Sequence, residues 1–191
     1  ILMPMLIAPV VVGLLARFSL EPTFGIVNQL IRQLGLPTQD FLGRPELALP
    51  TLIAIDVWQW TPFLFLILLA ALQGIPEDVI EAAKIDGANK FQQVVYVTLP
   101  LLVPLIVTNV LLQVGRIFYA DFGLFFNVTQ DQPALYRTTD VIDTFVYRSL
   151  RQLSNVSMAA AAGFYQAVVG LVLISLVNWI VRRINPERAL F

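Results

Sequence analysis

Long apolar runs alternate with short polar segments along this chain of 191 residues. The apolar runs lie at residues 1–16, 51–73, 100–118 and 158–181. At 1.5 Å per helical residue, the last three approach or exceed the thickness of about 30 Å of a bilayer's hydrocarbon core. The pattern predicts an all-α protein, a polytopic transmembrane helical bundle with about four membrane helices.

The first apolar run differs from the others because it contains Pro4, Pro9 and Gly13, which we expect to kink the helix. It starts at Ile1 inside apolar sequence, without an initiating methionine or a preceding basic segment. A secretory signal peptide would carry such a basic segment. We therefore expect an N-terminally truncated protein rather than a signal peptide.

The composition also favours a membrane protein, since 58% of the residues are hydrophobic and only 13% are charged. The mean hydropathy is +0.77. The chain has no cysteine and no histidine, which excludes disulfides, thiolate metal sites and imidazole bases. A net charge of −1 and the lack of a basic patch argue against a nucleic-acid partner. No G-x-x-x-x-G-K-[ST] loop is present, so any ATP that drives this protein binds another polypeptide.

A polar island at residues 74–99 separates the second and third apolar runs. Pro76 suits the first turn of a helix, and the two acidic residues after it suit the positive end of the helix dipole. Gly87 can end this helix because glycine adopts left-handed backbone without a Cβ clash. The island therefore predicts a short amphipathic helix over about 76–86. A second amphipathic run, 91–97, leads into the third apolar run.

The second apolar run contains one ionisable residue, Asp56. A charge at membrane depth costs about 3 kcal/mol, so such a residue is expected to face the protein interior and to have a function. Asp56, Gln59, Trp60 and Phe63 follow at i, i+3, i+4 and i+7, on one helix face. Aromatic rings stack on sugar C–H groups, and amides and carboxylates bind hydroxyls, so this face suits a sugar. An aromatic belt at the membrane interface is the alternative interpretation.

The third apolar run carries a second polar stripe of Asn109, Gln113 and Arg116, at i, i+4 and i+7. Interhelical hydrogen bonding, worth about 1 kcal/mol per bond in membranes, is the alternative to a pathway role. Tyr119 and Asp121 follow at the outer end of the run. Counting along each helix from its inner end places Asp56 and Arg116 at one depth, so we predict that the two pair inside the protein.

The remaining polar segments are expected to lie at the membrane surface. Residues 28–34 predict a short helix ended by Gly35 and Pro37. Thr138–Leu150 predicts a re-entrant or interfacial helix whose charges form a solvated face. The small residues 159–163 permit close approach of a partner helix at the start of the last run. Arg182, Arg183 and Arg188 close the chain.

The polar island carries the motif on which a resemblance to a known family rests. Glu81-Ala82-Ala83, then Gly87, then Leu99-Pro100 resemble the cytoplasmic loop of permease subunits from binding-protein-dependent ABC importers. Other segments resemble the sugar branch of that family, typified by the maltose and glycerol-phosphate permeases: Phe24–Asn28, Leu34–Leu36, Trp58–Phe63 and Leu72–Pro76.

The resemblance implies a type I ABC importer permease core, a transmembrane permease domain over residues 1–191 with a cytoplasmic coupling loop at 74–99. Such a chain is a multi-pass protein of a prokaryotic plasma or inner membrane and forms half of the translocation pathway for a sugar. Positive charges divide five against six between the two sides, so the cytoplasmic position of Glu81 and of the C-terminus also comes from the resemblance. ATPase coupling is expected from Glu81, Ala82, Ala83, Asp86 and Gly87. The substrate pathway is expected to include Asp56, Gln59, Trp60, Phe63, Asn109, Gln113, Arg116, Tyr119 and Asp121.

The partners that the resemblance implies are a second permease subunit, two ATPase subunits, an extracytoplasmic solute-binding protein, the lipid bilayer and the sugar. We expect no cofactor or metal in this chain, since ATP and Mg would bind the ATPase subunits. An importer for an amino acid, peptide or anion is the alternative, although such a site favours denser charge than Asp56 and Arg116 provide. Two further classes are alternatives. An intramembrane enzyme would need a nucleophile and a base, and the chain has no histidine or cysteine to provide them. A purely structural subunit would show no sugar-stimulated ATPase activity.

Overall fold

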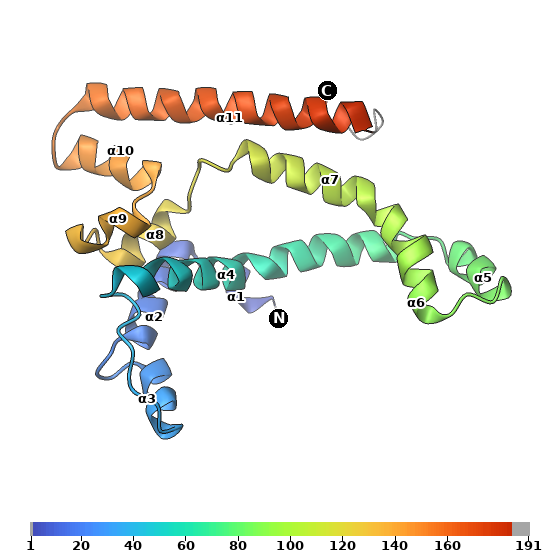
Figure 1. Cartoon of the computed structure of the whole chain (residues 1–191), viewed down its shortest axis with the longest axis horizontal. Coiled ribbons are helices and arrows are strands. Elements are labelled where there is room, and N and C mark those ends of the chain that lie inside the picture. Colours follow the sequence, from blue (N-terminus) through green and yellow to red (C-terminus); the bar gives the residue numbers. More distant parts are fainter. Residues whose placement is uncertain (1, 185–191) are drawn as a thin grey trace. The chain divides into compact units, whose positions relative to one another are not determined.

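The computed structural model describes residues 2–184, and every regular element in that range is a helix, as predicted (Figure 1). The chain divides into two compact units. Unit 1 combines residues 1–62 with 118–166, and unit 2 combines residues 63–117 with the remainder. The two units are described separately, and the helices α4 (Pro45–Gln73) and α11 (Val156–Ile184) contribute to both.

Three helices of the described chain are long and apolar enough to cross a membrane. They are α4, α11 and a continuous helix over Lys90–Gly115. This third helix consists of α6 (Lys90–Gln93), a π-helical turn (Val94–Thr98) and α7 (Leu99–Gly115). A shorter apolar helix, α2 (Pro9–Leu20), comes from the first apolar run.

The first apolar run forms two helices, so the prediction of one kinked helix was wrong. The short helix α1 (Met3–Leu6) ends before Ile7, and α2 starts at Pro9. Proline disfavours helical backbone in the residue before it, and Ala8 accordingly has φ −58° and ψ 138°. Pro9 therefore separates the two helices.

The third membrane helix begins ten residues before Pro100, where the sequence predicted its start. Asn89 accepts a hydrogen bond from the Gln92 backbone, and the Gln92 side chain accepts one from the Asn89 backbone, so this capping box starts the helix. The π-helical turn directly before α7 accommodates Pro100, which has no N–H to donate. The helix ends at Gly115, three residues before the predicted end at Phe118.

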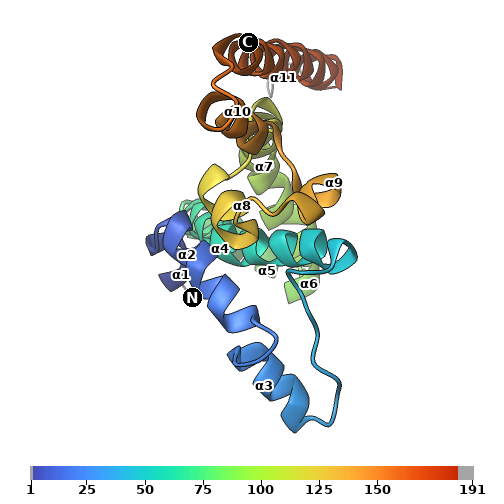
Figure 2. The same ribbon diagram turned by 90° about the vertical axis from the view of Figure 1, so that its left-hand side faces the viewer.

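In unit 1, α2 packs against α8 (Phe122–Thr129) (Figure 2). The helices approach closely at Gly13, where an added Cβ would lie 2.9 Å from the Asn127 Cβ. Arg17 at the end of α2 donates to the Val128 carbonyl oxygen at 3.1 Å. The buried core of this unit consists of Val12, Leu42, Leu52, Leu124 and Val128.

The predicted short helix at 28–34 is present as α3 (Ile26–Gln33), which begins two residues earlier. Gly35 follows with φ +75°, which explains why glycine ends this helix. Asn28 is fully buried, and its side chain hydrogen-bonds to backbone groups of Leu20, Glu21 and Gln39. This asparagine therefore fixes the connection between α2 and α4.

The segment after α8 contains a 3₁₀ turn (Pro133–Leu135), α9 (Tyr136–Thr139) and α10 (Ile142–Arg151). The predicted helix over Thr138–Leu150 is present as α10, but it begins four residues later, because the backbone is extended at Asp140 and Val141. The Thr144 hydroxyl donates to the Asp140 carboxylate at 2.6 Å and accepts from the Val141 N–H at 3.1 Å. These bonds stabilise a new helix start.

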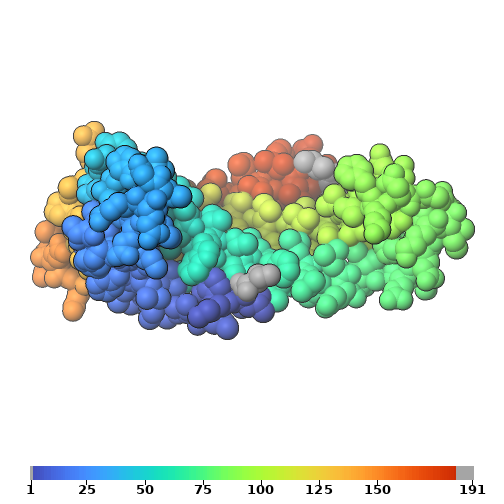
Figure 3. Space-filling model, turned by 90° about the horizontal axis from the view of Figure 1, so that it is seen from below, coloured from blue at the N-terminus to red at the C-terminus, as the bar shows by residue number. Residues whose placement is uncertain are grey.

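In unit 2, α5 (Glu77–Ile85) contacts α6, and their green residues lie side by side in Figure 3. The end of α7 approaches α11, since an added Cβ on Gly115 would lie 2.8 Å from Ile174 Cδ1. An added Cβ on Gly170 would lie 3.5 Å from the Gly115 carbonyl oxygen. The close approach within the described chain thus occurs at Gly170, and an added Cβ on Gly163 would meet nothing within 4 Å.

The last turns of α11 carry basic residues, as the sequence indicates. The Arg183 guanidinium lies 5.0 Å from the centroid of a Trp179 ring. Tryptophan and arginine are both common at the ends of membrane helices. Arg188 lies outside the described residues.

Candidate functional site

The predicted coupling loop forms a short helix with defined ends. Pro76 is the N-cap, so α5 begins at Glu77, slightly later than predicted. Gly87 has φ +79°. The Gly87 N–H donates to Lys84 and the Ala88 N–H donates to Ala83, each at 3.0 Å. This pair of bonds is a Schellman ending, which requires a left-handed residue where Gly87 stands.

The helix α5 has one buried position and an exposed polar face. Ala83 is 9% exposed, whereas Glu81, Ala82, Asp86 and Gly87 are exposed. A cavity of about 430 Å³ opens beside the polar face. Its lining residues are Leu72, Ile75, Glu77, Ile80, Glu81, Lys84 and Thr98. The five residues predicted for ATPase coupling therefore lie together on or next to this helix.

The first predicted pathway stripe has members in very different surroundings. Asp56 is half-buried, Gln59 is 1% exposed, and Trp60 is 43% exposed. The Gln59 Nε2 donates to the Ile7 carbonyl oxygen at 3.5 Å, in the break between α1 and α2. Gln59 Oε1 has no hydrogen-bond partner among the described residues. In unit 2, the side chain of Phe63 is 41% exposed.

Asp121 lies near Asp56 in unit 1, and its charge acts on that carboxyl group. The Asp121 Oδ1 accepts from the Leu124 N–H at 3.0 Å, so Asp121 is the N-cap of α8. Two preceding residues, Tyr119 and Ala120, lie in irregular backbone, and Tyr119 is 49% exposed. The structure thus brings together two of the predicted pathway carboxylates.

The second predicted stripe differs from its expected geometry at one residue. Asn109 donates to the Leu105 carbonyl oxygen of its own helix at 3.0 Å, and Gln113 is exposed. Arg116 is the C-cap of α7, with φ −106° and ψ 7°, so it lies after the last helical residue. Its predicted placement inside the third apolar helix was wrong, because that helix ends at Gly115.

Two polar residues that the sequence did not assign to the site contact the segment around Tyr119. Asp143 on α10 accepts from the Ala120 N–H at 2.9 Å. Gln166 on α11 donates to the Phe118 carbonyl oxygen and is 4% exposed. One feature of the sequence could have pointed to Gln166, because it is an amide inside a long apolar run. No feature pointed to Asp143, because its charge was attributed to a solvated helix face.

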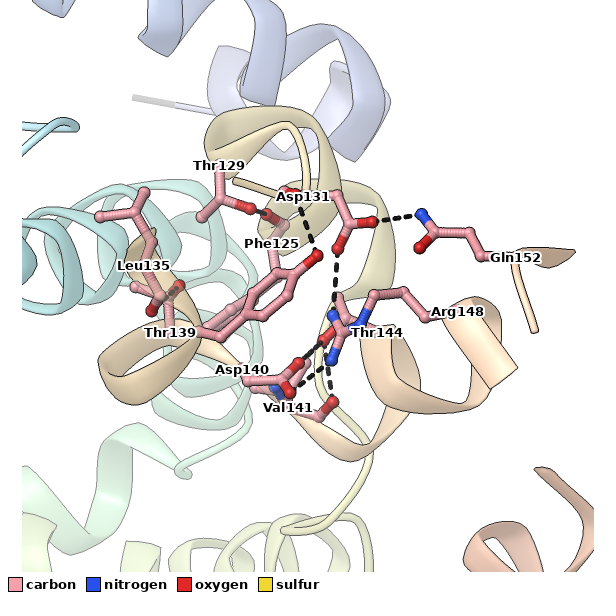
Figure 4. Close-up of polar contacts among 11 residues, drawn as sticks. Phe125, Thr129, Asp131, Leu135, Thr139, Asp140, Val141, Thr144, Arg148 and Gln152 are labelled. Atoms are coloured by element: carbon pink, nitrogen blue, oxygen red, sulfur yellow. Dashed lines mark hydrogen bonds and ion pairs between the residues drawn. The ribbon is translucent and has the colours of Figure 1, made fainter. Parts of the chain in front are cut away.

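Arg148 joins α10 to the segment between α8 and α10 (Figure 4). Its guanidinium forms ion pairs with Asp131, at 3.0 Å, and with Asp140. The guanidinium carbon also lies 4.1 Å from the centre of the Tyr136 ring. The side chains of Arg148 and Asp131 are 11% and 9% exposed, so the prediction of a solvated face was wrong for Arg148.

These contacts also change two pKa values. Burial lowers the pKa of Arg148, but its hydrogen bonds to Asp140 and Asp131 outweigh burial and raise that pKa overall. Burial raises the pKa of Tyr136, and the hydrogen bond with Asp131 and its negative charge raise it further. The cluster therefore favours a charged guanidinium and a neutral phenol.

Residues 1–186 match the family of the binding-protein-dependent transport system inner membrane component, and the chain belongs to this family. This membership confirms the resemblance, the all-α multi-pass architecture and the inner-membrane location. It also confirms a transport component rather than an enzyme.

Several curated relatives are similar over most of the chain. The probable ABC transporter permease protein y4oQ of Sinorhizobium fredii is 34% identical, over 93% of this chain and 56% of its own length. The polygalacturonan/rhamnogalacturonan transport system permease YteP of Bacillus subtilis is 30% identical, over 98% of this chain and 58% of its own length. The chain thus spans little more than half the length of these relatives.

A solved structure has the same fold. It is the crystal structure of a bacterial ABC transporter involved in the import of the acidic polysaccharide alginate. The match has a TM-score of 0.90 and 34% sequence identity, and it covers 96% of this chain and 64% of the solved chain. A second structure of a bacterial alginate transporter, in complex with a periplasmic protein bound to an alginate pentasaccharide, matches with a TM-score of 0.89.

Proposed function

We propose that this chain forms half of the translocation pathway of a sugar-importing ABC transporter and that α5 couples the pathway to ATPase subunits. The permease domain extends over residues 1–191, with the coupling loop at 74–99. Its partners are a second permease, two ATPase subunits that bind ATP and Mg, and an extracytoplasmic solute-binding protein.

The observation that carries the proposal is the geometry of α5. This short helix lies in the loop between two helices long enough to span a membrane. Gly87 ends it in left-handed backbone, and Glu81 and Lys84 remain exposed beside a cavity. A polar helix with a fixed end, placed between two spans, suits docking against a separate cytoplasmic protein.

Coupling follows from differential docking in two states of the ATPase pair. When ATP closes the pair, each ATPase moves the α5 helix of its permease, and the pathway opens to the outside. The solute-binding protein releases its sugar at this stage. The coupling residues Glu81, Ala82, Ala83, Asp86 and Gly87 transmit movement and carry out no bond chemistry.

The choice of a sugar is supported by the relatives and by the chemistry of the residues proposed for the pathway. Relatives are named for the transport of trehalose and maltose, polygalacturonan, and diacetylchitobiose. Asp56 and Asp121 provide hydroxyl-binding carboxylates, and the exposed rings of Trp60, Phe63 and Tyr119 provide stacking surfaces. Gln59, Asn109, Gln113 and Arg116 complete the proposed pathway.

A non-sugar solute is the second candidate. One relative is named for transport of sn-glycerol-3-phosphate, and the exposed cation of Arg116 suits a phosphate group. An amino acid or peptide importer is disfavoured, because the proposed pathway holds few charges.

Both candidates are tested by ATP hydrolysis in a reconstituted complex of the two permeases, the ATPase subunits and the solute-binding protein. Maltose, trehalose, diacetylchitobiose and alginate oligosaccharides form the sugar panel, and glycerol 3-phosphate and an amino-acid mixture form the comparison panel. The proposal predicts stimulation by at least one sugar. Stimulation by the amino-acid mixture alone would contradict it, and stimulation by glycerol 3-phosphate alone would favour the second candidate.

A further inference from the structure

We propose that Asp143 and Gln166 are positioning residues that hold residues 118–121 in the geometry required for sugar transfer. The inference rests on the proposed function, because it assigns Tyr119 and Asp121 to the sugar pathway. It adds two residues from later helices, α10 and α11, that the motif and the polar stripes do not include.

The segment between α7 and α8 has irregular backbone and needs hydrogen-bond partners from elsewhere. Helix α7 ends at Gly115 and α8 begins at Phe122. Near a membrane, irregular backbone is tolerated where it is buried in protein or lines a hydrated cavity. The Ala120 N–H donates to Asp143 Oδ2 at 2.9 Å, and the Phe118 carbonyl oxygen accepts from Gln166 Nε2.

These two bonds fix the backbone on both sides of Tyr119. The bond to Asp143 uses the backbone N–H of Ala120, and the bond from Gln166 uses the backbone carbonyl of Phe118. The two side chains come from different helices, α10 and α11. The Tyr119 side chain remains 49% exposed, so its ring can contact a solute while its backbone is held. An aromatic ring on a fixed backbone loses less conformational freedom when it binds.

Asp121, the next residue after Ala120, is held by a hydrogen bond to the following helix, α8. Its Oδ1 caps α8 through the Leu124 N–H at 3.0 Å, and its charge acts on Asp56. The bond between Asp143 and Ala120 therefore bears directly on the position of this carboxylate. Loss of the bond lets the backbone before Asp121 move and changes the arrangement of the two carboxylates.

The helix that carries Asp143 has its own support. Arg148, five residues later on α10, forms ion pairs with Asp131 and Asp140. Gln166 is 4% exposed, so packing restricts its side chain. Both positioning side chains thus come from constrained surroundings, which a positioning role requires.

Spin labelling tests the positioning role without depending on transport. The chain contains no cysteine, so Tyr119→Cys introduces one thiol for a nitroxide label in a complex whose other subunits are cysteine-free. The spectrum is recorded with Asp143, with Asp143→Asn, which keeps a hydrogen-bond acceptor, and with Asp143→Ala, which removes it. We expect the mobile fraction of the label to rise several-fold with Asp143→Ala and little with Asp143→Asn.

Gln166→Leu provides a second variant if Asp143→Ala fails to assemble, because leucine fills similar volume and lacks the N–H donor. Arg151→Ala is the matched control, since Arg151 is an exposed charge on the same helix as Asp143. A label whose mobility is unchanged in both Asp143→Ala and Gln166→Leu would overturn the inference.

Sugar dependence supplies the functional readout, measured with Tyr119 in place. For the sugar that best stimulates the unmodified complex, we expect Asp143→Ala and Gln166→Leu to raise the half-saturating concentration of sugar-loaded binding protein about tenfold. The maximal ATPase rate should change less, and Asp143→Asn should restore most of the affinity. Increased label mobility with unchanged sugar dependence would show purely structural bonds and overturn the positioning role.

The same experiments separate this inference from the proposed function. If no sugar stimulates the unmodified complex, the proposed function fails and the assignment to a sugar pathway fails with it. If sugar stimulates the complex and neither variant changes label mobility, the positioning role alone fails.

Discussion

The guanidinium group of Arg148 and the carboxylate of Asp131 form an ion pair at 3.0 Å in which the side chains are 11% and 9% exposed. Asp131 has φ +52°, in left-handed backbone that is uncommon for residues other than glycine. The Gln152 side chain also donates to Asp131, at 2.6 Å. Contacts from Arg148 on α10 and from Gln152, the C-cap of that helix, thus hold this left-handed turn in place.

Replacing Arg148 with methionine should destabilise unit 1, because it leaves the carboxylates of Asp131 and Asp140 without their cation. Breaking a buried ion pair costs about 3 kcal/mol. Arg148→Lys should recover only part of the loss, since one ammonium group cannot reproduce the two-pronged geometry of guanidinium. Thermal unfolding of the purified complex measures the effect.

Arg151→Ala serves as the control for Arg148→Met, because Arg151 is exposed on the same helix. An Arg148→Met complex that unfolds at the same temperature as the control would show that this ion-pair cluster contributes nothing to stability.

The raised pKa of Tyr136 predicts that the folded protein loses stability at alkaline pH. Burial and Asp131 raise the pKa of Tyr136 above its ordinary value of 10.0, so the folded state retains the phenolic proton more tightly than the unfolded chain. This stabilisation is complete below about pH 10 and is lost as the pH rises through the folded-state pKa. Tyr136→Phe should remove this component of the pH dependence.

Unfolding temperatures measured from about pH 9 to about pH 11 test the assignment to Tyr136. Tyr96→Phe is the control, because Tyr96 is 74% exposed. If the unfolding temperature of Tyr136→Phe falls equally steeply with rising pH, the loss of stability comes from other groups.

The sequence predicted features that depend on local chemistry. Apolar runs located the three long helices, and Gly87 marked the end of α5, because left-handed backbone favours glycine at that position. Gly35 ended α3 for the same reason. These signals require no knowledge of distant contacts.

Helix boundaries were less predictable because competing local signals adjoin each other. Pro100 suggested a helix start, but the capping box of Asn89 and Gln92 starts the helix earlier, and the π-helical turn accommodates the proline. Pro9 suggested a kink, but the extended backbone at Ala8 separates two helices.

The polar contacts of unit 1 depend on residues far apart in the sequence. Asp143 lies 23 residues from Ala120, and Gln166 lies 48 residues from Phe118. No helical or strand period relates positions at such distances. The pairing of Arg148 with Asp131, over 17 residues, was unpredictable for the same reason.

Gly87→Val should uncouple ATP hydrolysis from uptake. An added Cβ would meet nothing within 4 Å, so the cost comes from left-handed backbone alone, about 1–2 kcal/mol for a residue with a side chain. This cost should distort the end of α5. The expected result is an assembled complex whose ATPase activity no longer responds to the sugar-loaded binding protein, and whose uptake falls.

Gly35→Val is a matched control for Gly87→Val, because Gly35 has φ +75° and equally open surroundings. It imposes similar backbone strain outside the coupling loop and should leave coupling intact. Normal coupling in an assembled Gly87→Val complex would contradict the role of this turn.

The predicted pairing of Asp56 with Arg116 stays a prediction, since the two residues belong to different compact units. If they pair, Asp56→Ala should reduce transport more than the double change with Arg116→Ala, because the single change leaves the positive charge of Arg116 without its partner. Initial uptake rates of the three complexes supply the comparison. If the loss of uptake in the double variant equals the sum of the losses in the two single variants, expressed as free energies, the two residues act independently.

The central claim, that α5 docks on an ATPase subunit, is tested most directly by cross-linking from position 81. Because the chain has no cysteine, Glu81→Cys introduces one thiol on the exposed face of α5, in a complex whose other permease is cysteine-free. Glu46→Cys places a thiol at an exposed glutamate in the first turn of α4 as the control. With a short thiol-to-amine cross-linker, the account predicts a product with the ATPase subunit from position 81 and none from position 46. An intact complex that gives no such product from position 81, or gives it only from position 46, would contradict the account.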